Sequence, residues 1–244
     1  MAVIDASGVY YKELNEKIHE MIAGGETNIK IRNVNGQRYI GDALPGNIKL
    51  LLEGTPGNDL AAYMNGATVL VQGNTQEGTA NTMSGGTLVI HGRSGDATGY
   101  AMRGGSVFIR DDVGYRGGIH MKEYKEMVPA MVVGGSAGSF FGEYMAGGIL
   151  MVLNLNGQKE PVGDYCGTGM HGGVMYVRGE VAEYKLGKEV RVEPLTEQDK
   201  DTINTYVKQF AAHFDCSAED ILKGEFIKLV PYNARPYGNL YTHY

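Results

Sequence analysis

The stretch NTMSGGTLVIHGRSGDATGYAMRGGSVFIRDD, residues 81–112, contains one short pattern twice. Met83-Ser84-Gly85-Gly86 precedes the apolar run Leu88-Val89-Ile90, and Met102-Arg103-Gly104-Gly105 precedes Val107-Phe108-Ile109. The two copies lie 19 residues apart. A fixed step of this kind is typical of repeat architectures, in which each copy is one structural unit stacked on the next. The stretch therefore predicts a solenoid.

The same pattern continues on both sides of this stretch. A methionine stands two residues before a glycine in five copies: Met64 with Gly66, Met83 with Gly85 and Gly86, Met102 with Gly104 and Gly105, Met145 with Gly147 and Gly148, and Met170 with Gly172 and Gly173. Met131-Val132-Val133 and Leu50-Leu51-Leu52 fit the 19-residue step as further turns. This alignment predicts about seven turns over residues 29–192, with Ile29-Lys30-Ile31 and Val190-Arg191-Val192 at the more polar ends.

The glycines determine which kind of solenoid is expected. The runs between them are three or four residues long, which is too short for helices and suits strands. Short strands joined by glycine corners form the coils of a parallel β-helix, in which neighbouring coils are hydrogen-bonded about 4.8 Å apart. We expect an all-β fold whose methionines form an interior column. The Gly-Gly pairs should take positive φ at the corners.

Helical segments flank the repeat and predict three regions, 1–28, 29–192 and 193–244. In the first region, apolar residues at helical spacing end at a glycine pair and predict a capping helix: Tyr11, Leu14, Ile18 and Ile22, then Gly24-Gly25. In the last region, Thr196 and Ser217 begin two helices, and a tyrosine-rich tail follows. Helices at these places should cover solenoid ends that would otherwise associate edge to edge.

Composition narrows the class of protein. Glycine accounts for 37 of 244 residues, roughly twice its usual share of about 7%, without a collagen period. The net charge is −6, and basic residues form no stripe, so we expect no nucleic-acid partner. No run of 18 apolar residues and no signal sequence occur, which predicts a cytoplasmic protein with no membrane association. Cys166 and Cys216 are expected to be free thiols.

Two short motifs resemble catalytic or nucleotide-binding sequences. Residues 167–172 match GxGxxG, but that motif binds dinucleotides only where a helix begins, and the sequence continues as a strand from Gly173. Residues 134–138 match GxSxG, and Asp164 and His171 follow in the order of a hydrolase triad. The glycines of both motifs coincide with the repeat, so we interpret them as structural.

Metal binding and polysaccharide chemistry also have weak candidates. Six histidines, at positions 19, 91, 120, 171, 213 and 243, show no metal-ligand spacing. His91, His171 and Cys166 could share a metal only if their coils aligned. An independent β-helix enzyme would need carboxylates clustered on adjacent coils, for which Asp96, Asp111 and Asp112 are the candidates. We predict no catalytic, cofactor-binding or metal-binding residue.

Residues 118–127, GIHMKEYKEM, interrupt the 19-residue step and are the strongest candidate for a functional loop. The alternative is a solvated charged loop. If the segment contacts a partner, its deletion should leave the fold intact and weaken assembly.

Together these motifs resemble a known domain. The ordered segments YMNGATVLVQGN, TMSGGTLVIHGRSGDATGYAMRGG, VVGGSAGSFFGEYMAGG and GTGMHGG are similar to the carboxy-terminal GXGXG domain of the glutamate synthase large subunit. The resemblance covers roughly residues 40 to 192. It implies a right-handed parallel β-helix, in agreement with the repeat. One of the subunits of formylmethanofuran dehydrogenase has a similar domain.

The resemblance also implies a role. In glutamate synthases this domain carries no catalytic residue and packs between a glutamine amidotransferase domain and an FMN and iron–sulfur synthase domain. Here the sequence starts Met1-Ala2-Val3 where the amidotransferase has a cysteine nucleophile, and it has two cysteines where the three-iron cluster needs three. The expected role is a scaffold subunit for glutamate biosynthesis and ammonia assimilation. Its partners would be an amidotransferase subunit and an FMN and iron–sulfur synthase subunit, which carry the cofactors.

Several alternatives remain open from the sequence. A complex of the N-methylglutamate synthase type fits the motifs equally well. A formylmethanofuran dehydrogenase subunit and an independent β-helix enzyme are further interpretations, and the chain could also form a homo-oligomer.

Overall fold

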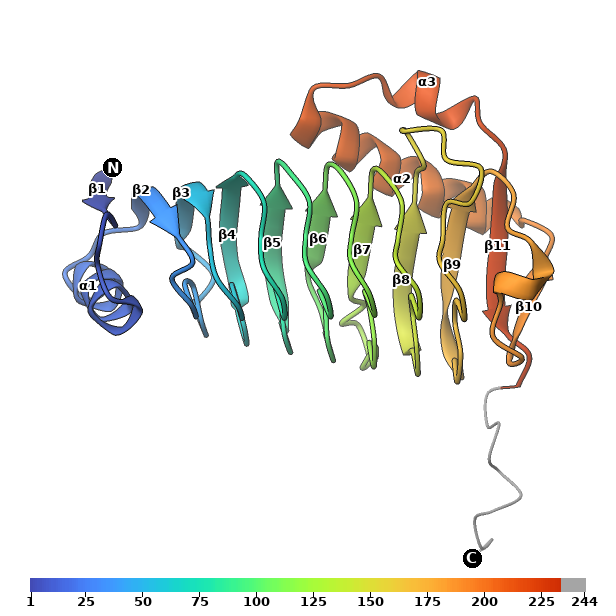
Figure 1. Ribbon diagram of the computed structural model, residues 1–244, viewed down its shortest axis with the longest axis horizontal. Helices are drawn as coiled ribbons and strands as arrows, with labels where there is room; N and C mark the ends of the chain where they lie inside the picture. Colours follow the sequence, from blue (N-terminus) through green and yellow to red (C-terminus); the bar gives the residue numbers. More distant parts are fainter. Residues whose placement is uncertain (234–244) are drawn as a thin grey trace, which may run out of the picture.

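The computed structural model describes residues 1–233 and has one dominant element, an 11-stranded sheet (Figure 1). The strand order is β1-β2-β3-β4-β5-β6-β7-β8-β9-β11-β10. The strands are β1 (Ala2–Asp5), β2 (Asn28–Asn35), β3 (Lys49–Thr55), β4 (Asn65–Gln72), β5 (Gly85–Ile90), β6 (Ser106–Ile109), β7 (Ala130–Val133), β8 (Ala146–Val152), β9 (Gly172–Arg178), β10 (Val190–Glu193) and β11 (Phe226–Pro231). The helices are α1 (Tyr11–Ala23), α2 (Glu197–Phe214) and α3 (Ala218–Leu222), with a short 3₁₀ turn at Glu183–Lys185.

The strands β1 to β9 are parallel, and their register confirms the parallel β-helix. Leu50 pairs with Val69, Val69 with Leu88 and Leu88 with Val107, so the register follows the step seen in the sequence. Two later steps are longer, because Val107 pairs with Met131 and Leu150 pairs with Met175. The inserted residues therefore lie between β6 and β7 and between β8 and β9.

The solenoid has about six turns rather than the expected seven. Val190-Arg191-Val192 lies in β10, which is not another parallel coil but pairs antiparallel with β11. Strand β11 in turn pairs antiparallel with β9 and separates the two. The chain thus returns after its helices and covers the last parallel strand.

The predicted methionine column lies inside the solenoid. The methionines that precede the strands β4 to β9 are all fully buried: Met64, Met83, Met102, Met121, Met145 and Met170. Met121 belongs to this column and follows Met102 by one regular step, although the sequence pattern did not include it. Within the glycine pairs the second member has the positive φ, for example +98° at Gly86 and +78° at Gly105, and it lies at or next to the start of a strand.

Between one strand and the next, each coil contains turns with left-handed residues at every second position. Ala97, Gly99 and Ala101 illustrate the pattern. The backbone N–H of Ala97 donates to Tyr115 O of the next coil, that of Gly99 to Thr79 O of the preceding coil, and that of Ala101 again to the next coil. This alternation links a coil to both neighbours without a second strand.

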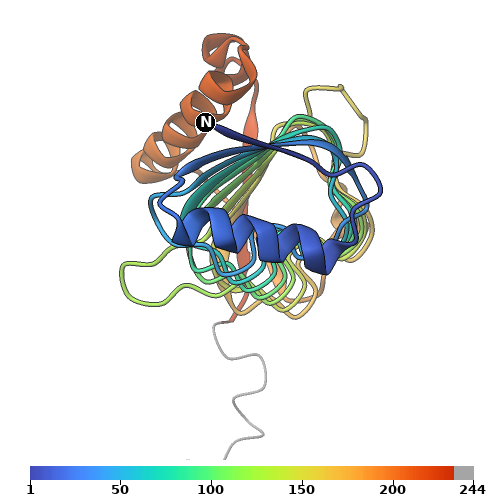
Figure 2. The ribbon, with the colours of Figure 1, turned by 90° about the vertical axis from the view of Figure 1, so that its left-hand side faces the viewer.

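Helix α1 covers the first end of the solenoid, where it lies across the opening (Figure 2). Leu14 and Ile18 of this helix are buried in the continuous apolar core. Strand β1 precedes the helix and pairs with β2, so residues 1–28 supply an additional strand as well as the predicted cap.

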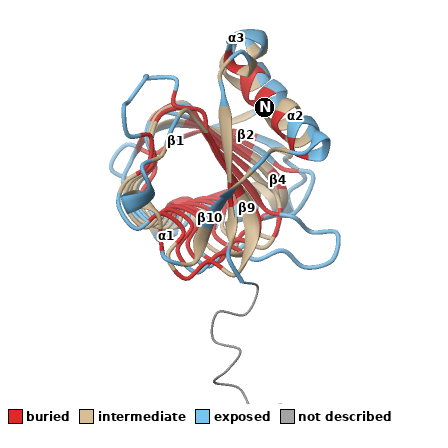
Figure 3. Cartoon of the chain, turned by 90° about the vertical axis from the view of Figure 1, so that its right-hand side faces the viewer, coloured by how far each residue is buried: buried red, intermediate tan, exposed pale blue. Residues whose placement is uncertain are grey.

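Helix α2 does not cover the other end. It lies along the outside of the sheet (Figures 1 and 3), where Ile203, Val207 and Phe210 pack on the outward side chains of β5 to β9. Those outward residues are also apolar and buried: Val89, Phe108, Val132, Met151 and Tyr176. The other end is protected by β11, which occupies the edge that a further parallel coil would otherwise use. Part of the predicted tail is therefore a strand, while residues 234–244 lie outside the described residues.

Candidate interaction surface

Neither short motif forms a catalytic or nucleotide-binding site. The last glycine of the GxGxxG match, Gly172, is the first residue of strand β9, so no helix begins where a dinucleotide requires one. The GxSxG match follows β7, and Ala137 within it forms a parallel bridge to Val162 of the next coil. Ser136 donates its hydroxyl to Asp112 Oδ1 at 2.9 Å. Both motifs are part of the solenoid backbone.

The histidines and cysteine considered as alternative metal ligands are not brought together. The His91 ring packs edge-on against Phe214, with ring centroids 5.1 Å apart. His171 Nδ1 lies 3.1 Å from Gly169 O, and Cys166 is buried in the core, where burial raises the pKa of its thiol to about 12. Within residues 1–233 no three His, Cys, Asp or Glu side chains are placed to hold a metal ion.

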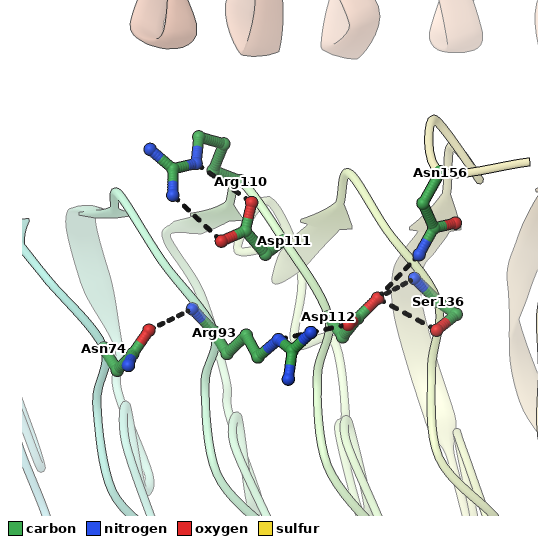
Figure 4. A network of polar contacts seen from close by, with 7 residues as sticks. All are labelled: Asn74, Arg93, Arg110, Asp111, Asp112, Ser136 and Asn156. Atoms are coloured by element: carbon green, nitrogen blue, oxygen red, sulfur yellow. Dashed lines mark hydrogen bonds and ion pairs between the residues drawn. The ribbon is translucent and has the colours of Figure 1, made fainter.

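A polar network crosses four coils at one corner of the solenoid (Figure 4). Asn74 Oδ1 accepts the Arg93 backbone N–H at 2.9 Å, and Arg93 Nε lies 3.3 Å from Asp112 Oδ2. Asp112 Oδ1 accepts three further hydrogen bonds, from the backbone and hydroxyl of Ser136 and from Asn156 Nδ2. The network surrounds an open hollow of about 370 Å³.

The carboxylates of this network are engaged in holding coils together. Asp111 forms a two-pronged pair with Arg110, at 2.9 Å for both contacts, and this hydrogen bonding lowers the pKa of the Asp111 carboxyl. On the neighbouring coil corner, Asp96 accepts the Tyr115 backbone N–H at 2.8 Å. Each carboxylate thus satisfies a corner N–H or an arginine, so these three residues do not supply the free acid and base pair that glycoside chemistry needs.

Two histidines lie where the end of α2 meets the sheet, and they make its docking sensitive to acid. Burial lowers the pKa of both His91 and His213, and Arg110 and His91 respectively lower them further. Because the folded pKa values lie below the unfolded value of about 6.5, stability from these neutral rings is complete above that pH and is lost below it. We expect the melting temperature to fall between about pH 7.5 and about pH 5.5, and to fall less in the double variant H91Q/H213Q. Equal falls, measured by circular dichroism, would contradict this.

A second corner of the solenoid is both aromatic and basic. We define the aromatic–basic corner as the residues lining an open hollow of about 310 Å³ that carry rings or positive charge: Tyr100, Arg103, His120, Lys122, Tyr144 and His171. The rings of Tyr100 and His120 are 5.9 Å apart, and those of His120 and Tyr144 are stacked at 5.2 Å. These residues come from successive coils.

The structure corrects the bounds of the segment 118–127. Gly118 donates to Thr98 O as a regular coil residue, and Met121 belongs to the buried column. The extra residues follow Lys122 and form a small loop, closed by mutual backbone hydrogen bonds of 3.0 Å between Tyr124 and Met127 (projecting in green in Figure 2). This excursion borders the aromatic–basic corner, since Lys122 lines that hollow and also the one beside the loop.

The fold and its surface define a β-solenoid protein in which, over residues 1–233, the polar side chains of the coil corners mainly serve to join coils. A model of the GXGXG motif family matches residues 11–232, and the chain belongs to that family, whose fold is the C-terminal domain of glutamate synthase. The uncharacterized protein MJ1350 of Methanocaldococcus jannaschii is 46% identical over 250 residues, which cover 98% of this chain and 96% of that protein. No helix within residues 1–233 has the length and apolar character that crossing a bilayer requires.

Proposed function

We propose that this chain is a non-catalytic scaffold subunit of a glutamate synthase-like complex. Its partners would be a glutamine amidotransferase subunit and a synthase subunit that carries FMN and an iron–sulfur cluster. The observation that carries this proposal is the family match over nearly the whole chain, because it relates the solenoid to a domain that packs between two enzyme centres.

The chemistry of the chain supports a role without catalysis. The sequence has two cysteines, fewer than the three ligands of the expected cluster, and Cys166 is enclosed in the core. The candidate carboxylates Asp96, Asp111 and Asp112 are each held by another coil or an arginine. A continuous apolar core joins the coils, so the solenoid is suited to holding two partners at a fixed separation.

The test is isolation of the chain, tagged at its native locus, followed by mass spectrometry and cofactor spectra of the purified assembly. Stoichiometric recovery of an amidotransferase and a flavin and iron–sulfur protein is the expected result. Recovery of tungsten or molybdenum enzyme subunits would identify the formylmethanofuran alternative and contradict the proposal. A chain that elutes without partners and turns over a substrate alone would also contradict it.

The excursion offers a second test of assembly. Removing residues 123–127 restores the 19-residue step between β6 and β7, and V128G with P129G copies the Gly-Gly of the preceding coil. We expect a folded protein, because Met121 and the strand pairing are retained, and weaker recovery of partner subunits, because a projecting loop is lost. Circular dichroism and the same isolation measure the two effects. Undiminished recovery would exclude the excursion as a contact.

A further inference from the structure

The aromatic–basic corner keeps large rings where the backbone disfavours them. His120 and Tyr144 have φ of 57° and 53°. Each directly precedes a buried methionine, and the corresponding residue one coil further on is Gly169. A left-handed conformation costs a residue with a Cβ about 1 kcal/mol or more, whereas glycine adopts it freely. Both rings are largely exposed, so burial returns little of this cost.

The corner is also locally positive on a chain of net charge −6. Arg103 and Lys122 form no ion pair with a carboxylate among residues 1–233. Carboxylates of the same coils are occupied elsewhere: Glu143 Oε2 lies 2.8 Å from Arg116 Nε, and Glu123 Oε2 accepts the Gly148 N–H at 3.0 Å. The two cations are therefore available to an external anion.

We propose that the aromatic–basic corner binds an acidic polypeptide segment of a partner subunit. The proposal rests on the proposed function, because that function supplies the partner. Carboxylates of the segment would pair with Arg103 and Lys122, and its side chains or backbone would pack on Tyr100 and Tyr144. Tyrosine and arginine are among the residues that contribute most energy at protein interfaces.

The shape of the surface favours an extended chain over a small molecule. The hollow at the corner is open, and Arg103 and Lys122 also line a neighbouring hollow beside the excursion. Small-molecule sites enclose most of their ligand. A row of rings on coils spaced about 4.8 Å apart instead suits a segment of several residues that runs along the solenoid.

The first experiment measures fluorescence anisotropy of a labelled oligoglutamate peptide with the full chain, at about 50 mM and about 300 mM NaCl. We expect binding that weakens with salt, at least about tenfold weaker binding by R103E/K122E, and unchanged binding by K49E/K208E. The control pair makes the same change of net charge at exposed lysines elsewhere. Equal binding by both double variants, or equal binding of an oligoglutamine peptide, overturns the proposal. Tighter binding of a labelled oligothymidylate would do so in favour of nucleic acid.

The variant Y144G separates binding from folding. Glycine relieves the left-handed strain, so we expect an unchanged or higher melting temperature together with weaker peptide binding. A lower melting temperature with unchanged binding would assign the ring a structural role and overturn the proposal.

Isolation of the assembly separates this proposal from the scaffold itself. If wild type recovers the partner subunits and R103E/K122E does not, both are supported. If R103E/K122E recovers them undiminished, the scaffold stands and the corner is not their contact. If the wild type binds the peptide, R103E/K122E does not, and no subunit accompanies the wild type, the acidic-ligand chemistry stands and the proposed function fails.

Discussion

Replacing Gly105 with alanine is expected to destabilise the solenoid by about 2–4 kcal/mol, because it adds both backbone strain and a steric clash. Gly105 has φ of +78°. A Cβ there would lie 2.7 Å from Gly86 O and 2.6 Å from the end of Met83. The methionine can move, but the carbonyl belongs to the neighbouring coil and cannot move without disturbing the stack. Equilibrium unfolding in guanidinium chloride measures the loss.

A matched substitution separates strain from crowding. Gly157 also has a positive φ, +65°, but a Cβ there would have no neighbour within 4 Å. G157A should cost only the conformational penalty, about 1 kcal/mol. Equal losses for the two variants would show that close approach between coils is not what requires glycine at position 105.

Replacing Phe210 with alanine should cost about 3–5 kcal/mol, because its ring is fully buried between α2 and the sheet. The ring lies close to the end of β7, so that a Cβ added at Gly134 would be 2.6 Å from Phe210 Cζ. We expect F210A to loosen α2 before the solenoid unfolds, since the core inside the coils is a separate cluster. Limited proteolysis should then cut first within α2.

Lys208 provides the control on the same helix. Its side chain is exposed, so K208A should change stability by no more than about 0.5 kcal/mol. If F210A unfolds the whole chain in one transition at the same rate at every site, α2 and the solenoid form one cooperative unit, and the separate loosening of α2 is wrong.

The register of the coils could be predicted from the sequence because it depends on local pattern. Leu50, Val69, Leu88 and Val107 are evenly spaced along the chain and do pair in the sheet. Met121 is harder to find because the excursion displaces the strand that follows it, so spacing measured between strands no longer points to this residue. Where an insertion lies between two repeat markers, only one of them stays in step.

The contacts between distant segments could not be predicted in the same way. Strand β11 follows two helices and ends at Pro231, so no local period marks it as the neighbour of β9. The position of α2 did have a signal. Outward residues such as Val89, Phe108 and Val132 are apolar, and strands that are apolar on both faces are covered on both faces.

The aromatic–basic corner could be recognised only in three dimensions. Arg103 and Lys122 are one regular step apart, and Tyr144 lies further along with the excursion between. Their proximity follows only from knowing where the extra residues leave the coil. The sequence marks the excursion as special but not the surface that it borders.

The regular coil also sets a unit of length for any assembly built on this chain. Removing or adding one complete coil would change the separation of the two ends by about 4.8 Å while leaving both end surfaces intact. Such a change is compatible with the packing only before β5, because α2 lies across the strands from β5 to β9 and would lose its alignment with them. The early coils are therefore the part of the molecule in which distance between partners can be adjusted in discrete steps.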